Sequence, residues 1–534
     1  MRLATGGNSG SESGASVAVP RTDIAAVIDA AIRPPYLRTD VCERALNARD
    51  ARFDGVFFVG ITTTRIYCRP VCPSRFAASA HRRFFNSAAA AERAGFRPCL
   101  RCRPELAPGR PWVNAVQHLA ATAAHRINAG DLNGRSVAAL ARELGVSERH
   151  LRRALERELG VSPVELAQTH RLLLAKRLLA DTGLSVTQIA FASGFQSVRR
   201  FNCAFREHYR MPPTAVRRAT AAEAGVARSG RNVAAPRDFV RLTLGYRPPL
   251  AWDALLASLQ RDATPCVDAI DGQRYGRTVR MGEHRGVVLV ADAAAAARRV
   301  RGVGQPHLQV DVSTTLVPAL MPLLARLRQL FDLDAEPAVI DAHLQQGGLG
   351  ELVARRPGMR VPGAMDGFDI ALRALLGGLG HSTTGTERAG RVASALGEAI
   401  ETGVPALTRL APSAPRLAEA GPERLVELGV APRRARSIVQ LARLVADGAL
   451  RLEPGGDAFA AHRTLAELGG VGERLATLIL MRAQRWPDAF PASDPALRRA
   501  VAIPSPSALL ARAEQWRPWR AYAAMHLWLD EQEG

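Results

Sequence analysis

Four cysteines form the clearest chemical pattern in this sequence, because they fall into two close pairs. Cys68 and Cys72 lie in C-R-P-V-C, Cys99 and Cys102 lie in C-L-R-C, and 26 residues separate the two pairs. Two such pairs can supply four thiolates to a single tetrahedral metal ion, and zinc is the usual occupant. The sequence therefore predicts a Zn²⁺ cofactor that all four cysteines bind.

The residues around these cysteines are strongly basic. From Arg65 to Arg110 the chain has ten arginines and only two acids, Glu92 and Glu105. A zinc ion with four thiolates carries a net double negative charge, so we expect an electron-rich centre among guanidinium groups. Such a centre suits a nucleophile that accepts an alkyl group while it is held against phosphate. A purely structural zinc site is the simpler alternative.

The segment from Asp54 to Pro104 contains D-G-V-F-F-V-G-I-T-T-T-R-I-Y-C-R-P-V-C and F-R-P-C-L-R-C-R-P. In spacing and flanking residues it resembles the N-terminal domain of the Ada methyl-phosphotriester repair proteins. The resemblance implies that Cys68 takes a methyl group from a DNA methylphosphotriester, once per molecule. It also implies tighter DNA binding after methylation, because one negative charge is lost. Arg65 departs from the family, which has glycine at this position.

A second pattern predicts two successive helix-turn-helix units. In the first unit Ser136 and Ser147 can cap two helices around a turn at Gly145, and Gly194 supplies the corresponding turn in the second. The outward side chains of each second helix suit a DNA major groove. We predict DNA contacts from Arg149, His150, Arg152, Arg153, Arg199, Arg200, Asn202 and Arg206.

The double unit contains G-F-Q-S and ends in Met-Pro-Pro, and it resembles the AraC/XylS regulator domain. The resemblance implies sequence-specific binding to promoter DNA and activation of transcription, with RNA polymerase as a further partner. The alternative is a set of helices that only pack and carry solvated charge.

A third pattern lies near the C-terminus, where residues 461–480 predict a helix-hairpin-helix. Gly470 and Gly472 let the backbone approach closely, and amides at the start of the second helix can face a DNA phosphate. The segment F-P-A-S-D-P follows, and its Asp494 lies 22 residues after Gly472. Because Pro495 suits the first position of a helix, Asp494 can be an N-cap, a catalytic carboxylate or both.

Together with W-R-P-W-R-A-Y near the end, these motifs resemble the AlkA-type branch of helix-hairpin-helix DNA glycosylases over residues 237–530. The resemblance implies that Asp494 is catalytic in the hydrolytic excision of alkylated purines of the 3-methyladenine type from a flipped-out nucleotide. It places Trp528 in the base pocket and Leu379 near the side chain that wedges into the duplex. The hairpin has no lysine, so we expect no strand nicking.

Several positions depart from the AlkA pattern. Arg474 and Leu478 stand where relatives have tryptophan and tyrosine, and G-G-L-G-H at Gly377–His381 replaces the common Gly-Gln-Gln-Val-Ser. Aromatic rings bind a cationic base, whereas an arginine repels it. These departures leave an alternative open, in which the chain is an alkylation-sensing transcription regulator whose degenerate glycosylase domain only binds DNA.

Composition agrees with a DNA partner. The net charge is +21 and the pI is about 11.0, and Lys176 is the only lysine, so a polyanion is the natural partner. We expect that partner to be double-stranded DNA, both alkylated and promoter DNA. No apolar run approaches the roughly 20 residues that span a bilayer, and there is no signal peptide. We therefore expect no membrane partner. Seven cysteines, four of them assigned to metal, favour a reducing compartment, so we expect a bacterial cytoplasmic, nucleoid-associated location.

The sequence predicts a multidomain α+β protein. Its parts are a small zinc-bound α/β module, an all-α double helix-turn-helix, an α+β sheet subdomain and an all-α glycosylase domain. The expected boundaries are a disordered extension at 1–35, the zinc module at 36–108, the helix-turn-helix domain at 110–220, a linker at 221–236, the sheet subdomain at 237–312 and the glycosylase domain at 313–534.

Overall fold

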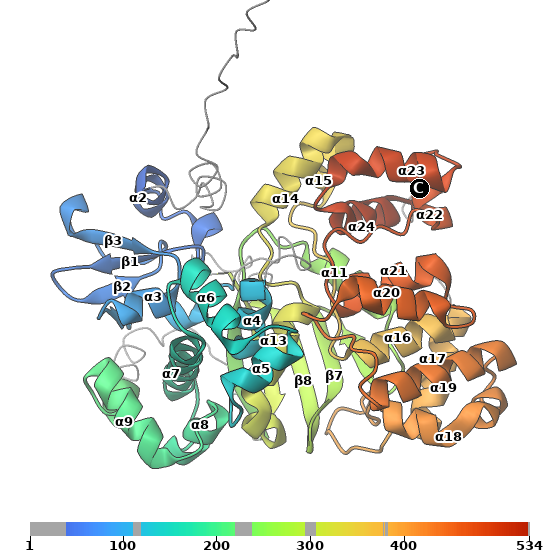
Figure 1. Ribbon diagram of the computed structural model, residues 1–534, viewed down its shortest axis with the longest axis horizontal. Coiled ribbons are helices and arrows are strands. Elements are labelled where there is room, and N and C mark those ends of the chain that lie inside the picture. The colour runs from blue at the N-terminus through green and yellow to red at the C-terminus, as the bar shows by residue number, and fades with distance from the viewer. Residues whose placement is uncertain are drawn as a thin grey trace, which may run out of the picture.

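The computed structural model describes residues 39–109, 119–218, 238–293, 306–377, 379 and 383–531. The predicted 1–35 extension, the 221–236 linker and most of the Gly377–His381 segment lie outside these ranges. In Figure 1 a small module with strands lies at the upper left and a mostly helical region at the right. The helix-turn-helix helices run from the lower left, below the small module, to the centre, where a larger sheet lies. The predicted multidomain α+β class is confirmed.

The first module is a four-stranded sheet with two helices. Its strand order is β3-β1-β2-β4, with β2 antiparallel to β1 and parallel to β4. Arg65 lies in the turn between β1 and β2 with φ of 55°, so it adopts the left-handed conformation that favours glycine. The elements are α2 (Thr39–Asn47), β1 (Phe58–Ile61), β2 (Ile66–Cys68), β3 (Arg82–Phe85), α3 (Ala88–Arg93) and β4 (Arg97–Pro98).

The two predicted helix-turn-helix units are present and flank one long helix, α7. Ser136 and Ser147 accept hydrogen bonds from backbone amides at the starts of α5 and α6, as predicted. Gly145 and Gly194 have φ of 70° and 84°, which explains why glycine makes both turns. The helices are α4 (Leu119–Asn128), α5 (Val137–Glu143), α6 (Glu148–Leu159), α7 (Pro163–Asp181), α8 (Val186–Ala192) and α9 (Val198–Tyr209).

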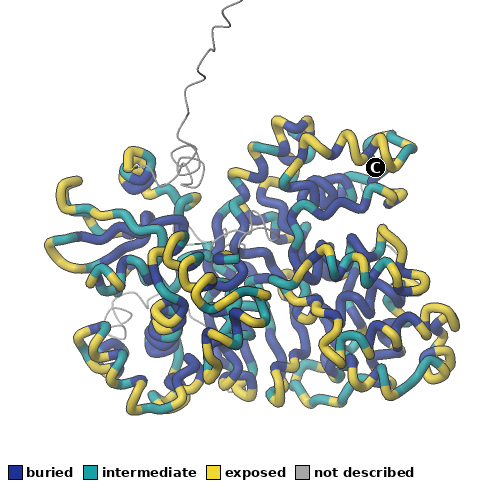
Figure 2. Tube along the Cα trace, in the orientation of Figure 1, coloured by how far each residue is buried: buried dark blue, intermediate teal, exposed yellow. Residues whose placement is uncertain are grey.

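A five-stranded antiparallel sheet occupies the middle of the molecule, in the order β5-β9-β8-β7-β6. Apolar residues of the sheet, such as Leu242 and Val310, belong to the same buried cluster as Leu178 and Phe205 of the helix-turn-helix region. The sheet subdomain and the second helix-turn-helix unit therefore share one core, visible as buried chain in Figure 2. The elements are β5 (Phe239–Gly245), α11 (Trp252–Arg261), β6 (Asp268–Asp271), β7 (Arg274–Met281), β8 (His284–Asp292) and β9 (His307–Ser313).

The C-terminal region is helical and has two buried clusters, one built by α16–α21 and one mainly by α14, α15 and α22–α24. Within the described ranges, no helix is both long and apolar enough to cross a membrane. The helices are α13 (Leu320–Leu330), α14 (Pro337–Leu344), α15 (Gly350–Arg355), α16 (Gly367–Leu376), α17 (Thr383–Leu396), α18 (Ala414–Glu427), α19 (Pro432–Ala446), α20 (Ala458–Glu467), α21 (Gly472–Ala483), α22 (Pro495–Ala500), α23 (Pro506–Ala513) and α24 (Arg520–Glu531).

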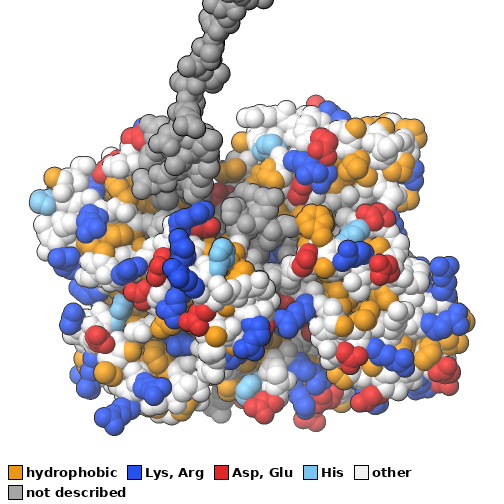
Figure 3. Space-filling view, viewed as in Figure 1, with side chains coloured by type: hydrophobic (Ala, Val, Ile, Leu, Met, Phe, Trp, Pro, Cys, Tyr) orange, Lys and Arg blue, Asp and Glu red, His pale blue; other side chains and the backbone are white. Residues whose placement is uncertain are grey.

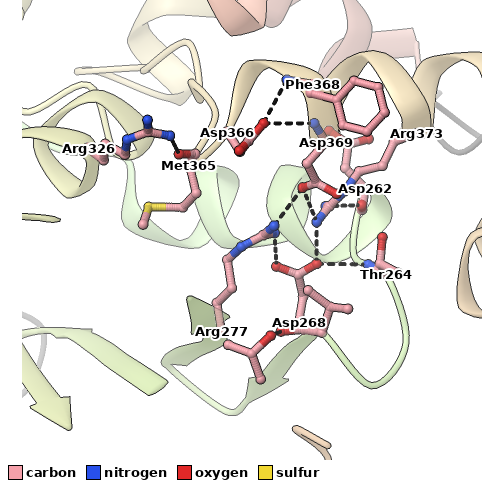
Figure 4. A network of polar contacts seen from close by, with 12 residues as sticks. Asp262, Thr264, Asp268, Arg277, Arg326, Met365, Asp366, Phe368, Asp369 and Arg373 are labelled. Carbon is pink, nitrogen blue, oxygen red and sulfur yellow. Dashed lines mark hydrogen bonds and ion pairs between the residues drawn. The ribbon is translucent and has the colours of Figure 1, made fainter. Parts of the chain in front are cut away.

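A buried network of two arginines and two aspartates fixes α16 against the central sheet (Figure 4). Arg277 of β7 contacts Asp268 and Asp369 at 2.6 Å each. Arg373 of α16 contacts the same two carboxylates at 2.7 and 2.9 Å. Since the charges balance, the network can stay buried, and it orients the helix that leads to the Gly377–His381 segment.

Candidate functional sites

The four predicted metal ligands meet in one cluster. Their sulfur atoms all lie within 4.8 Å of one another. Cys68 ends β2 and Cys99 follows β4, and the backbone N–H of Cys99 donates to the carbonyl of Tyr67 at 3.0 Å. The parallel pairing of these two strands is therefore what joins the two halves of the motif. In the part of the chain that the structure describes, this is the one group of three or more such side chains placed to hold a metal.

The electrostatics of the cluster fit a divalent cation. Hydrogen bonding from Cys102 and Cys68 lowers the pKa of the Cys72 thiol to about 6, whereas burial raises the pKa of Cys102 well above its usual value. The four sulfurs thus compete for protons, because adjacent thiolates repel one another. A bound Zn²⁺ removes this conflict by coordinating every sulfur as a thiolate. The donor set and its spacing fit zinc as the cofactor.

All four cysteines are buried, but two of them keep slightly more exposed surface than the others. Cys68 and Cys99 are 6% and 7% exposed, whereas Cys72 and Cys102 are 0% and 1% exposed. The backbone N–H of Arg69 also donates to the Cys102 sulfur at 3.4 Å. The side of Cys68 and Cys99 is therefore the least covered side of the cluster.

The arginines around the cluster divide into two groups. Arg69 is buried and paired with Asp54, and Arg103 pairs with Glu105 and Asp181 at 3.0 and 2.6 Å. These charges are balanced within the fold, so they add little attraction for DNA. A second group is exposed, namely Arg65, Arg75, Arg83, Arg93 and Arg101. Of these, Arg93 also contacts Glu165 at 3.7 Å.

The helix-turn-helix side chains predicted to contact DNA lie on the surface. All of them are exposed except Asn202, which is half-buried. The apolar residues predicted to face inward are buried, as Leu151 and Leu155 of α6 and Phe201 and Phe205 of α9 show. In Figure 3, Lys and Arg side chains gather over α6 near the centre of the view. The exposed surface of the second helix of each unit is thus basic.

Cys203 of α9 differs from its expected position. The sequence suggests a packed or half-exposed residue, but the structure places it on the exposed face beside Arg206. The reason is its register, because Phe201 and Phe205 take the inward positions of the helix. Cys203 is therefore an accessible thiol outside the metal cluster.

The predicted hairpin joins α20 to α21. Leu465, Leu468 and Val471 are buried, while Gly470 and Gly472 are exposed with φ of 87° and 62°. These backbone conformations are open to glycine and costly for other residues. The hairpin can therefore present the first amides of α21 to a phosphate group.

Asp494 caps helix α22 and also contacts Arg474 and Trp528. Its Oδ1 accepts hydrogen bonds from the backbone N–H groups of Ala496 and Leu497 at 3.0 and 3.4 Å, so it is the N-cap of α22. The indole Nε1–H of Trp528 donates to the same oxygen at 3.3 Å. Arg474 donates to the other oxygen, Oδ2, at 3.1 Å. The fold thus brings three residues from distant parts of the sequence into one site.

The other expected pocket residues lie around the α16–α21 cluster. Leu478 is half-buried on α21, and Leu379 is half-buried and packs against this cluster. The positions on either side of Leu379 lie outside the described residues, so the departure at Gly377–His381 has no structural account.

Sequence reasoning noted Lys176 only as the single lysine, and the structure shows what it does. Its side chain is 1% exposed on α7, where Nζ donates to the carbonyl of Cys99 at 2.9 Å and to Glu105 at 2.6 Å. This contact ties a metal-ligand loop to the helix between the two helix-turn-helix units. The sequence signal for this residue was that it is the single lysine in an arginine-rich chain. Its partners, Cys99 and Glu105, could be identified only from the tertiary fold.

Three family descriptions match parts of the chain. They are the metal binding domain of Ada over residues 41–105, a helix-turn-helix domain over 140–219 and the AlkA N-terminal domain over 241–366. Each of these ranges contains elements that the sequence motifs predicted.

Whole-chain similarity extends these matches. The chain is 36% identical to the probable bifunctional transcriptional activator/DNA repair enzyme AlkA of Mycobacterium tuberculosis, covering 91% of this chain and 95% of that protein. It is 32% identical to DNA-3-methyladenine glycosylase 2 of Escherichia coli, covering 54% of this chain and 97% of the relative. It is also 36% identical to the bifunctional transcriptional activator/DNA repair enzyme Ada of Escherichia coli, covering 28% of this chain and 40% of the relative.

Proposed function

Since the chain belongs to the family of bifunctional transcriptional activators and DNA repair enzymes, we propose that it repairs alkylated DNA at two separate sites. Cys68 accepts methyl groups from the phosphate backbone, and Asp494 acts in excision of alkylated purines of the 3-methyladenine type. The helix-turn-helix domain carries the methylation signal to promoter DNA and to RNA polymerase. The place of action is the nucleoid of the bacterial cytoplasm.

The proposed methyl transfer rests on the all-thiol metal cluster and on Cys68, which keeps 6% of its residue surface exposed. Zinc, when bound, keeps these thiols ionised at neutral pH. The Cys68 sulfur attacks the methyl carbon of an uncharged phosphotriester, in line with the phosphate oxygen. A carbon–sulfur bond forms as the carbon–oxygen bond breaks, and the electron pair leaves with the phosphodiester. The resulting thioether is not readily cleaved, so each molecule reacts once.

Mass spectrometry of the zinc-loaded full chain tests this assignment. After incubation with DNA carrying methylphosphotriesters, we expect one added methyl group on the peptide with Cys68. Cys203→Ser should react to the same extent, because Cys203 is exposed but binds no metal. Methylation of Cys203 or Cys99 in place of Cys68, or none in a zinc-loaded sample, would contradict the assignment.

Base excision rests on the position of the Asp494 carboxylate. Two backbone amides and the Trp528 indole hold Oδ1, and Oδ2 has one side-chain partner, the Arg474 guanidinium. A flipped-out nucleotide develops positive charge on its sugar as the base departs, and a nearby carboxylate stabilises that charge and orients water. The chain has no lysine in this region to form an imine with the sugar, so the strand stays intact.

Release of 3-methyladenine from alkylated DNA is the direct assay for this activity. Asp494→Asn should lower the single-turnover rate by at least about 100-fold, because the negative charge is lost. Asp457→Asn is the matched control, since Asp457 also caps a helix, α20, through two backbone amides but lies outside the site. Equal rates for wild type and Asp494→Asn would rule out the catalytic role.

One observation favours a second candidate function. The Arg474 guanidinium already contacts Asp494 at 3.1 Å, and such a pairing opposes the attraction of a positive sugar. A regulator with an inactive glycosylase region would bind DNA normally and release no base. The same assay, combined with a DNA-binding measurement on wild type, distinguishes this function from repair.

A further inference from the structure

Arg474 is placed to select substrates rather than to brace the fold. Its side chain is 45% exposed, and within the described part of the chain its one polar partner is Oδ2 of Asp494. The helix that carries it, α21, is anchored by other side chains: Ala476, Ile479 and Leu480 are buried in the cluster. Two more arginines near the end of α21 act as anchors as well.

Arg482 and Arg485 have a structural role in the same region. Arg482 pairs with Asp262 at 2.5 Å and is 11% exposed, and Arg485 pairs with Asp332 and is 6% exposed. Each joins α21 or the turn after it to a distant segment. Arg474 differs from both, because it is 45% exposed and its partner is the carboxylate assigned to the chemistry.

The charge of Arg474 changes what the site attracts. An unpaired carboxylate would draw a cationic base, but here a guanidinium at 3.1 Å offsets that negative charge. The same guanidinium repels a positively charged purine directly. It has further N–H donors beyond the one on Asp494, and these suit the oxo and ring-nitrogen acceptors of an uncharged base.

We propose that Arg474 shifts the excision site toward uncharged lesion purines with oxo acceptors, such as deaminated adenine, at the expense of cationic alkylpurines. This inference rests on the proposed glycosylase function and assigns it a preferred substrate class other than the 3-methyladenine type. The bond between the sugar and the base nitrogen breaks, and its electron pair leaves with the base. An uncharged base therefore departs as an anion, which Arg474 stabilises by hydrogen bonds. Water adds to the sugar carbon, and its proton passes to Asp494 or to the leaving base.

Single-turnover excision from two defined duplexes tests the inference with the full chain. One duplex carries a single hypoxanthine, which is uncharged, and the other a single 7-methylguanine, which is cationic. We expect wild type to favour hypoxanthine. Arg474→Gln should lower the hypoxanthine to 7-methylguanine rate ratio at least tenfold, and Arg474→Trp should lower it further by adding a stacking surface for the cation.

Arg463→Gln is the matched control, because Arg463 is an exposed arginine on the neighbouring helix α20. Loss of this charge should change both rates by the same factor and leave their ratio unaltered. Arg474→Lys should retain part of the preference, since it keeps the charge but not the planar donor set.

The outcomes separate this inference from the proposed function. If wild type releases either base and Asp494→Asn does not, the glycosylase function stands. An unchanged ratio in Arg474→Gln then overturns the inference alone. If wild type releases neither base while binding both duplexes, the glycosylase function and the inference fail together.

Discussion

In each candidate site, a residue with a structural role is also the residue proposed to carry out the chemistry. Asp494 caps α22 through two backbone amides and also faces Arg474 and Trp528. Cys68 ends a strand and is a metal ligand by position. Because a structural role and a proposed chemical role fall on the same side chain, stability and activity must be measured separately for each variant.

Arg65 is a residue where backbone strain predicts a difference in stability. It has φ of 55°, and its guanidinium lies 5.6 Å from the centre of the Phe96 ring. Arg65→Ala keeps the strained conformation and loses the ring contact, whereas Arg65→Gly loses the contact but relieves the strain. We expect the glycine variant to be more stable than the alanine variant by about 1 kcal/mol.

Hydrogen exchange of the β1 and β2 amides in the zinc-loaded chain measures this local free energy. Arg75→Ala is a suitable control, because Arg75 is an exposed arginine of the same module without positive φ. Equal protection in the glycine and alanine variants would show that the turn does not impose the left-handed conformation.

At the scale of secondary structure elements, buried polar contacts fix how a helix sits against its neighbours, which apolar packing alone does not determine. The network around Asp268 holds α16 against β6 and β7 (Figure 4). Lys176 holds α7 against the metal-ligand loop. Removing one member of such a network leaves buried charges without partners. The cost of that loss exceeds the net contribution of the intact network.

Asp268→Asn should lower the free energy of unfolding by about 3–5 kcal/mol, because Arg277 and Arg373 both lose a charged partner. Asp271→Asn is the control, since Asp271 lies on the same strand but is exposed. Denaturant unfolding monitored in the central sheet measures the difference. A change no larger than that of Asp271→Asn would mean that the network contributes little.

The difference in the free energy of unfolding between wild type and Asp268→Asn should also depend on pH. Burial alone would raise the pKa of Asp268, but Arg277 and Arg373 outweigh it and lower the pKa to about 2. A lowered pKa stabilises the folded state above the unfolded value near 4, and this contribution disappears as pH falls toward 2. The advantage of wild type over Asp268→Asn should therefore shrink by about 2 kcal/mol between roughly pH 4 and pH 2. An advantage that is independent of pH in this range would contradict this assignment.

At the scale of the whole molecule, the regulator and repair regions share a core. One buried cluster contains residues of α7–α9 and of the central sheet, so these regions pack as a single unit. The zinc module joins the same body through Lys176 and through Glu92, which accepts a hydrogen bond from Thr169 of α7 at 2.5 Å. We therefore expect the DNA-reading helices and the sheet to unfold together.

Leu242→Ala tests this coupling, because Leu242 lies on β5 in the shared cluster and is 0% exposed. The substitution should cost about 2–5 kcal/mol and increase hydrogen exchange both in the sheet and in α7–α9. Leu417→Ala is the control, since Leu417 is equally buried in the separate α16–α21 cluster. An increase confined to the sheet would show that the two regions unfold independently.

The sequence by itself determined the local chemistry of this protein. Paired cysteines, serine caps, glycine turns and a hairpin depend on residue type and short spacing, so the zinc cluster, both helix-turn-helix units and the hairpin were predictable. Only the tertiary structure decided which distant residues meet: Arg474 with Asp494, Lys176 with Cys99, and the helix-turn-helix core with the sheet. The physical reason is that local patterns are set by backbone geometry between near neighbours. Contacts across long stretches of chain depend on how complete elements bury their surfaces against each other.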